Sequence, residues 1–125
     1  MDVRVTDDLP ETTSIHWHGM HVAARFDGGP HQPIAPATTW EPSWKVAQPA
    51  ATLWYHPHPH GSTQVHTYRG LAGLVLVDDE TSDDPGLPHG YGIDDLPPSC
   101  RTRPSIRTAY STNVTTKAAD CSAAP

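Results

Sequence analysis

The sequence lacks the features that mark several common protein classes. Its two cysteines, Cys100 and Cys121, lie near the end of the chain in no metal-ligand spacing, and they say little about the redox compartment. Eight lysines and arginines stand against fourteen acidic residues, giving a net charge of −6 with no basic cluster, which argues against nucleic acid as a partner. The longest apolar run, residues 70–77, is far too short to span a bilayer. Residues 1–10 carry no apolar signal region, so we expect no export signal in this chain.

Proline, glycine and short alternating segments dominate what is present. Fourteen prolines and nine glycines in 125 residues are typical of a loop-rich fold, and no segment shows a sustained helical period. Short strands with turn signals between them predict one all-β domain, a Greek-key β-sandwich. The expected strands are DVRVT, SIHWH, TTWEPSWKV with a break at Pro42, AATLWYH and LAGLVLVDDE.

The composition changes near residue 97. Residues 97–125 contain no Leu, Phe, Trp or Gly and are dense in Ser, Thr and Arg. Nothing in this stretch alternates over a useful length. We therefore divide the chain into a folded domain, residues 1–96, and a disordered or out-of-frame tail, residues 97–125.

Nine histidines are an unusual number for this length, and four of them form two closely spaced pairs. His16 and His18 stand in IHWHG, and His56 and His58 stand in LWYHPHPHG. On a strand, side chains two residues apart share a face and are separated by roughly 6.5 Å at the backbone. The prolines around His58 keep the second segment extended, but His56 and His58 converge only if it stays nearer β than polyproline geometry.

The chemistry of these pairs favours a metal site. All four candidate ligands are neutral nitrogens, with no thiolate and with no Asp or Glu immediately beside either pair. Imidazole suits Cu, Zn, Fe and Ni, and copper leads the affinity order, so the residues alone leave copper and zinc both open. Taken singly, the other histidines are better explained as ordinary surface or core residues: His21, His31, His66 and His89. His60 continues the spacing, but holding the loop would explain it equally well.

Four blocks of sequence together resemble a known family. The segments HWHG, DGGP, QPAATLWYHPHPHG and GLAGLVLVDDE match, in order and spacing, the first cupredoxin domain of three-domain multicopper oxidases. The nearest kinds are bacterial copper-efflux oxidases, spore-coat laccases and bilirubin oxidases. The resemblance covers about residues 3–96.

The resemblance implies a specific site and reaction. Such enzymes hold three coppers between their first and last domains, and they reduce dioxygen to water with electrons taken from phenols or cuprous ions. By motif position, His16 would bind the type 2 copper, and three residues would bind the type 3 pair: His18, His56 and His58. Asp27 of FDGGP matches an acid that helps to deliver protons near the type 2 copper, although a turn-forming Asp explains it about equally well. The position of His60 is not a ligand in the family.

The sequence also departs from the family. It has no HCH motif and so no type 1 copper site, which leaves half of a trinuclear site that a missing C-terminal cupredoxin domain would complete. We therefore expect the isolated chain to be inactive. The start reads as one or more strands into the first domain, so we expect a fold incomplete at the N-terminus. Enzymes of this kind are commonly periplasmic or extracellular.

The tail suggests a change of reading frame. If GC-rich codons are chosen for PSCRTRPSIRT and each codon is started one base earlier, the result can read IVQDPAFDPD, which is the continuation expected from the family.

Two other functions start from the same residues. The chain could be a non-catalytic copper- or zinc-binding β domain, or a non-functional fragment, although four histidines without Asp, Glu or Cys make a poor closed zinc site. A cupin oxygenase also uses HxH on a strand, but it needs a nearby Glu ligand, and none follows His18 closely.

Overall fold

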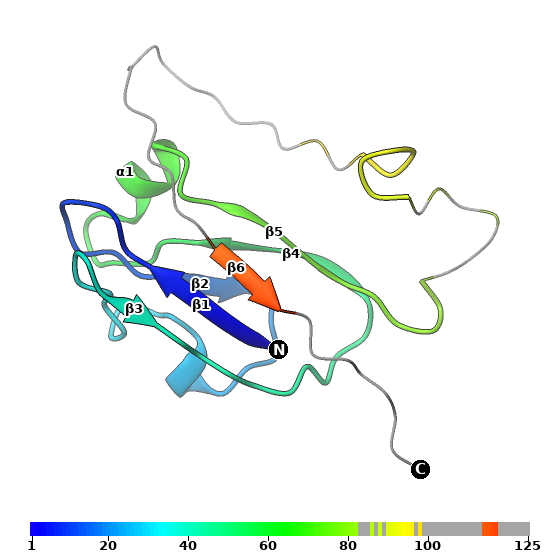
Figure 1. Ribbon diagram of the computed structural model, residues 1–125, viewed down its shortest axis with the longest axis horizontal. Helices are drawn as coiled ribbons and strands as arrows, with labels where there is room; N and C mark the ends of the chain where they lie inside the picture. Colours follow the sequence, from blue (N-terminus) through cyan, green and yellow to red (C-terminus); the bar gives the residue numbers. More distant parts are fainter. Residues whose placement is uncertain (83–85, 87, 89, 97, 99–113, 118–125) are drawn as a thin grey trace.

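A computed structural model describes residues 1–82, 86, 88, 90–96, 98 and 114–117. These residues form two antiparallel three-stranded sheets joined by loops and one short helix (Figure 1). The fold is therefore all-β, as the alternating segments predict. No helix in the described part is long and apolar enough to cross a membrane.

The first sheet is built around β1 (Asp2–Thr6), which lies between β3 (Thr39–Trp40) and β6 (Val114–Lys117). Val3 and Val5 alternate with exposed residues along β1, so one face of this strand is buried. The expected long strand around Pro42 is indeed interrupted, because Pro42 cannot donate to a ladder. Its carbonyl still accepts from the Val3 amide at 3.1 Å, which keeps the chain beside β1.

Strand β6 lies within the segment for which we expected no regular structure. Its four residues pair antiparallel with β1, Val3 opposite Thr116 (Figure 1). The β-branched run Val-Thr-Thr suits a strand, and β1 offers an open edge to it. The structure thus differs from the expectation at these four residues. Within residues 97–125, the structure describes only Pro98 and Val114–Lys117. Most of the stretch on which the reading-frame hypothesis rests therefore lies outside the described residues.

The second sheet carries the histidines. Its order is β2 (His16–His18), β4 (Ala51–His56) and β5 (Gly73–Val77). The register sets His16 directly opposite His56.

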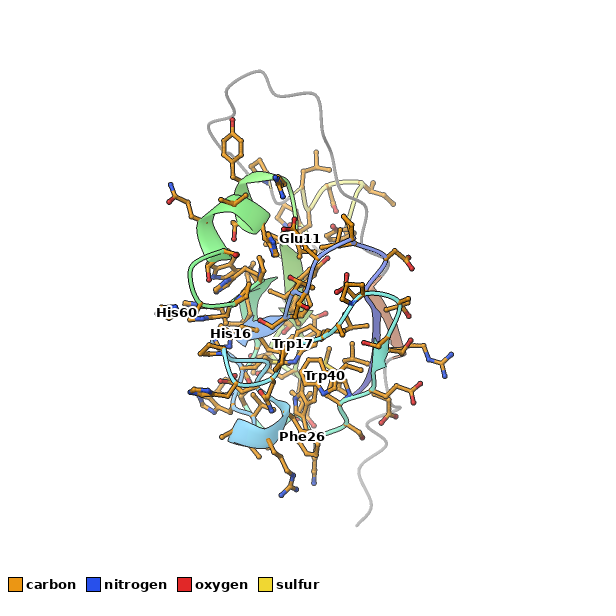
Figure 2. All side chains as sticks on the ribbon, turned by 90° about the vertical axis from the view of Figure 1, so that its left-hand side faces the viewer. Glu11, His16, Trp17, Phe26, Trp40 and His60 are labelled. Atoms are coloured by element: carbon orange, nitrogen blue, oxygen red, sulfur yellow. The ribbon has the colours of Figure 1, made fainter. Side chains whose placement is uncertain are left out.

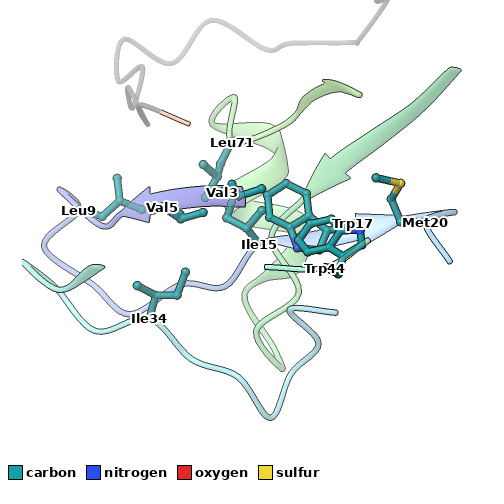
Figure 3. Close-up of a cluster of buried hydrophobic side chains, with 9 residues drawn as sticks. All are labelled: Val3, Val5, Leu9, Ile15, Trp17, Met20, Ile34, Trp44 and Leu71. Carbon is teal, nitrogen blue, oxygen red and sulfur yellow. The ribbon is translucent and has the colours of Figure 1, made fainter. Parts of the chain in front are cut away.

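The core lies between the two sheets (Figure 3). Trp17 on β2 is fully buried, with its ring centroid 5.6 Å from that of Trp44 and 6.1 Å from that of Tyr55. Removing such a side chain typically costs 3–5 kcal/mol, so Trp17 anchors the strand that bears two candidate ligands. The buried apolar residues are Val3, Val5, Leu9, Ile15, Trp17, Met20, Ile34, Trp44 and Leu71.

Two short helical segments lie in the loops that flank β2 and β4. The 3-10 turn η1 (Ala24–Phe26) precedes the DGGP loop, and the helix α1 (Thr63–Tyr68) follows the HPHPHG loop. Six residues make fewer than two turns, which is too short for a period to be visible in the sequence.

Candidate metal centre

The pairing of β2 with β4 brings all four predicted histidines together. The ring centroid of His16 lies 5.6 Å from that of His18, 5.2 Å from that of His56 and 5.4 Å from that of His58. The centroids of His56 and His58 are 5.7 Å apart, which is the convergence that near-β geometry allows. Figure 2 shows His16 toward one margin of the molecule, with Trp17 inside.

Backbone carbonyls fix the proton positions on two of the rings. Nδ1 of His16 lies 3.0 Å from the Asp27 carbonyl oxygen, and Nδ1 of His56 lies 2.9 Å from the Pro57 carbonyl oxygen. A carbonyl can only accept, so each Nδ1 carries the proton, and Nε2 of the neutral ring keeps its lone pair. This arrangement, in which one ring nitrogen donates to a carbonyl and the other remains basic, is the usual one for a metal-binding histidine.

Asp27 reaches His16 because the DGGP loop packs unusually close to β2. Gly28 has φ of +72°, and a Cβ there would lie 1.6 Å from the Ile15 carbonyl oxygen, so only glycine fits. The Asp27 carbonyl accepts from the Trp17 amide at 3.2 Å as well as from the His16 ring. The Asp27 carboxylate lies 3.2 Å from the same His16 nitrogen. Asp27 therefore orients His16 through both its backbone and its side chain.

Three of the imidazoles lie close enough for one metal centre. His16, His18 and His56 each offer a nitrogen within 4.8 Å of the others, and Nδ1 of His18 lies 3.3 Å from Nε2 of His56. Two nitrogens bound at about 2.0–2.1 Å to one ion can be at most about 4.2 Å apart. The residues thus fit one ion after small side-chain movements, or two adjacent ions. In the part of the chain that the structure describes, no other group of three such residues meets this spacing.

The electrostatics of His56 favour the form that binds metal. Burial lowers its pKa below the ordinary 6.5, although the bond to the Pro57 carbonyl opposes the shift. The neighbouring imidazoles, those of His16, His18 and His58, lower the pKa further. His56 is therefore neutral, with an available lone pair, at neutral pH.

The histidines share their face of the sheet with apolar side chains. Trp54 lies opposite both His18 and Leu74, and its ring stacks on that of His56 at 4.2 Å. Trp54, Leu74 and Leu76 are 38%, 38% and 39% exposed, while the opposite face of β4 and β5 packs on the core. We call these three residues the outer apolar face. A sheet that is apolar on both sides is typical of one that is covered on both sides.

The remaining histidines do not join this cluster. His21, His31 and His60 are exposed, and none belongs to the group of three imidazoles. His66 is buried on α1, with Nδ1 3.0 Å from the Thr13 hydroxyl and Nε2 3.5 Å from Glu11. It is thus a bonded interior histidine, in line with the ordinary explanation. His89 lies outside the described residues.

Sequence reasoning missed two residues beside the cluster. Ser14 is buried, and its hydroxyl accepts from the backbone N–H of His58 at 3.0 Å. The available signal was the number of prolines, since a Pro-His-Pro segment leaves one backbone donor that needs a partner. Trp54 could have been found from its position two residues before His56, which places it on the same face.

Comparison with known proteins identifies the family. Residues 1–82 match the model of the family described as multicopper oxidase. The chain belongs to the multicopper oxidase family. It is 41% identical over 95 residues to the multicopper oxidase mco of Staphylococcus aureus, covering 76% of this chain and 21% of that protein. This chain thus spans about a fifth of the length of such relatives. The cell division protein FtsP of Escherichia coli is 40% identical over 89 residues, covering 71% of this chain and 19% of FtsP.

Solved structures of multicopper oxidases share the fold. The laccase-like multicopper oxidase CueO of Ochrobactrum sp. superposes with a TM-score of 0.73 at 43% identity, covering 77% of this chain and 22% of that one. A laccase from Pediococcus acidilactici superposes with a TM-score of 0.70 at 36% identity, covering 74% and 20%. The domain is therefore cupredoxin-like, as the resemblance implied. Relatives of similar identity thus carry different names, one for an oxidase and one for cell division. The function of this chain therefore has to be argued from its own residues.

Proposed function

We propose that this chain is the amino-terminal domain of a copper-dependent oxidoreductase and supplies half of the histidine ligands of a trinuclear copper cluster. His16 is assigned to the type 2 copper, and the type 3 pair takes His18, His56 and His58. When bound, the cluster supplies the reduction of dioxygen to water, coupled to oxidation of phenols or cuprous ion. The domain is proposed to comprise residues 1–96 and the tail to comprise residues 97–125, of which Val114–Lys117 pair with β1 in the structure.

The observation that carries this proposal is the convergence of four imidazoles from β2, β4 and the loop that follows β4, with two Nδ1 protons held by backbone carbonyls. Ordinary surface histidines need no such orientation. The chain itself binds and orients: β2 and β4 set the ring spacing, while Asp27 and Pro57 set the tautomers of His16 and His56.

Asp27 is proposed to have a second role as a proton carrier. Its carboxylate lies 3.2 Å from His16 Nδ1 and is a little over one-third exposed, so it contacts both the candidate ligand and water. A group in that position can pass protons between solvent and the neighbourhood of the type 2 site. Its backbone carbonyl orients His16 regardless of the charge on the carboxylate.

The remaining ligands are proposed to come from the C-terminal cupredoxin domain of the same oxidase. The outer apolar face lies directly beside the histidines, so a domain that completes the site would also cover Trp54, Leu74 and Leu76. The chain has no HCH motif, and by itself it is expected not to turn over substrate. By family, the oxidase is placed in the periplasm or outside the cell.

Copper titration of matched histidine variants tests the ligand assignment. His18→Ala and His56→Ala should abolish copper binding measured by calorimetry and by copper(II) EPR. His21→Ala and His31→Ala, which alter exposed imidazoles outside the cluster, should leave it unchanged. A loss confined to the two control variants would show that the wrong imidazoles were chosen, and phenol or cuprous oxidation by the copper-loaded chain would contradict its predicted inactivity.

A second candidate function is binding of copper or zinc without redox turnover. It is favoured by the spacing of His16, His18 and His56, since three imidazoles can hold zinc without help from another domain. Competition between copper and zinc separates the zinc-binding form of this second function from the proposed copper site. Zinc bound in preference to copper at equal concentration would favour the second function.

A further inference from the structure

In the second histidine pair, the backbone amide of His58 has no partner in the β2–β4 hydrogen-bond ladder. Pro57 and Pro59 carry no N–H, so the amide of His58 is the one backbone donor between His56 and His60. Strand β4 ends at His56, and the amide of His58 lies beyond its last pair. A part-buried donor without a partner would cost free energy and leave the segment loose.

The register shows which residue faces His58. His18 pairs with Trp54 and His16 pairs with His56, so continuing in steps of two places Ser14 opposite His58. The Trp17 amide is taken by the Asp27 carbonyl rather than by β4. Ser14 continues the pairing by its side chain: its hydroxyl accepts from the His58 amide at 3.0 Å.

Ser14 is itself held firmly. It is 1% exposed, and its neighbour Thr13 exchanges backbone hydrogen bonds with Ile34 at 3.0 and 2.8 Å. The Thr13 hydroxyl also bonds to the buried ring of His66. An acceptor that is buried beside a firmly bonded neighbour can therefore fix the backbone of the residue that bonds to it.

We propose that Ser14 is a positioning residue that holds the backbone of His58 so that its imidazole joins the cluster with His16 and His56. This inference rests on the proposed function, in which His58 is a ligand. It gives the serine before IHWHG a role at His58, a residue on the facing segment that lies 44 positions further along the chain. The two prolines restrict the backbone of the segment, and the bond from the His58 amide to Ser14 sets how the segment lies against β2.

The test compares Ser14→Ala with two control variants. Ser14→Thr keeps the hydroxyl, and Thr38→Val removes a hydroxyl whose partner is the Ala35 carbonyl rather than Ser14 or His58. In the metal-free chain, NMR hydrogen exchange of the His58 amide should be about tenfold faster in Ser14→Ala than in wild type. Copper affinity should fall about 10- to 100-fold, toward that of His58→Ala. Thr38→Val should retain wild-type values for both, and Ser14→Thr should give values close to those of wild type. Circular dichroism confirms that each variant is folded.

Each outcome bears on the proposal. Wild-type exchange of the His58 amide in Ser14→Ala would overturn it, as would unchanged copper affinity in Ser14→Ala when His58→Ala binds weakly. If the wild-type chain and every variant fail to bind copper, the proposed function fails and the ligand role falls with it. The exchange measurement then still decides whether Ser14 holds this backbone.

Discussion

Replacing Gly28 with alanine should disrupt both the fold and the candidate site. The residue has φ of +72°, where an L side chain costs about 1–2 kcal/mol, and the new Cβ would lie 1.6 Å from the Ile15 carbonyl oxygen. Backbone atoms cannot remain that close, so the loop must move away from β2. The movement would break two bonds to the Asp27 carbonyl, from the Trp17 amide and from the His16 ring, at about 0.5–1.5 kcal/mol each. We expect a total loss of about 2–5 kcal/mol in the free energy of unfolding.

Gly29 provides the matched control. A Cβ there meets nothing within 4 Å, and its φ is not in the left-handed region, so Gly29→Ala should change stability by less than about 1 kcal/mol. Urea unfolding followed by tryptophan fluorescence, to which the buried Trp17 contributes with three other tryptophans, measures both variants. Equal midpoints for Gly28→Ala and Gly29→Ala would refute the reasoning. A destabilised Gly28→Ala that keeps the His16 ring-nitrogen shifts of wild type would refute the link to the site.

Three further predictions follow from burial. Burial raises the pKa of Asp7 above 3.8, so the folded state keeps the Asp7 proton to a higher pH than the unfolded state does. The free energy of unfolding should therefore fall as the pH rises through the raised pKa. Asp7→Asn should remove this fall, as measured by urea midpoints from pH 4 to 7. Leu71→Ala should cost about 2–5 kcal/mol because Leu71 is 1% exposed, whereas Leu76→Ala on the outer apolar face should cost under about 1 kcal/mol. A similar loss in the two leucine variants would show that the burial is wrongly assigned. Arg4→Ala should cost less than about 1 kcal/mol by thermal unfolding, since the ion pair of Arg4 with Glu41 is largely exposed.

Local spacing predicted the parts of the site that depend on one strand. His16 and His18 share a face because a strand repeats every two residues, and the alternation of Val3 and Val5 marks β1 in the same way. The sandwich class followed from short strands and frequent turns. That these histidines bind copper stays a prediction.

The contacts that sequence reasoning could not reach join segments far apart in the chain. The bond from His58 to Ser14 depends on the register of β2 against β4, and the bond from His16 to Asp27 depends on how closely the Gly28 loop packs. Neither is encoded in a periodic pattern. Strand β6 was missed for the same reason, since it forms only against the edge of β1.

The closeness of His18 on β2 to His56 on β4 has a consequence for how the sheet opens. Strand β2 is three residues long and lies at the edge, with β4 as its one partner in the sheet. Such a strand has few backbone bonds to its neighbour, so side-chain contacts such as those of the buried Trp17 hold it in place. Copper held by His18 and His56 would link the two strands through their side chains, so metal occupancy would change how often this edge separates from the rest of the sheet.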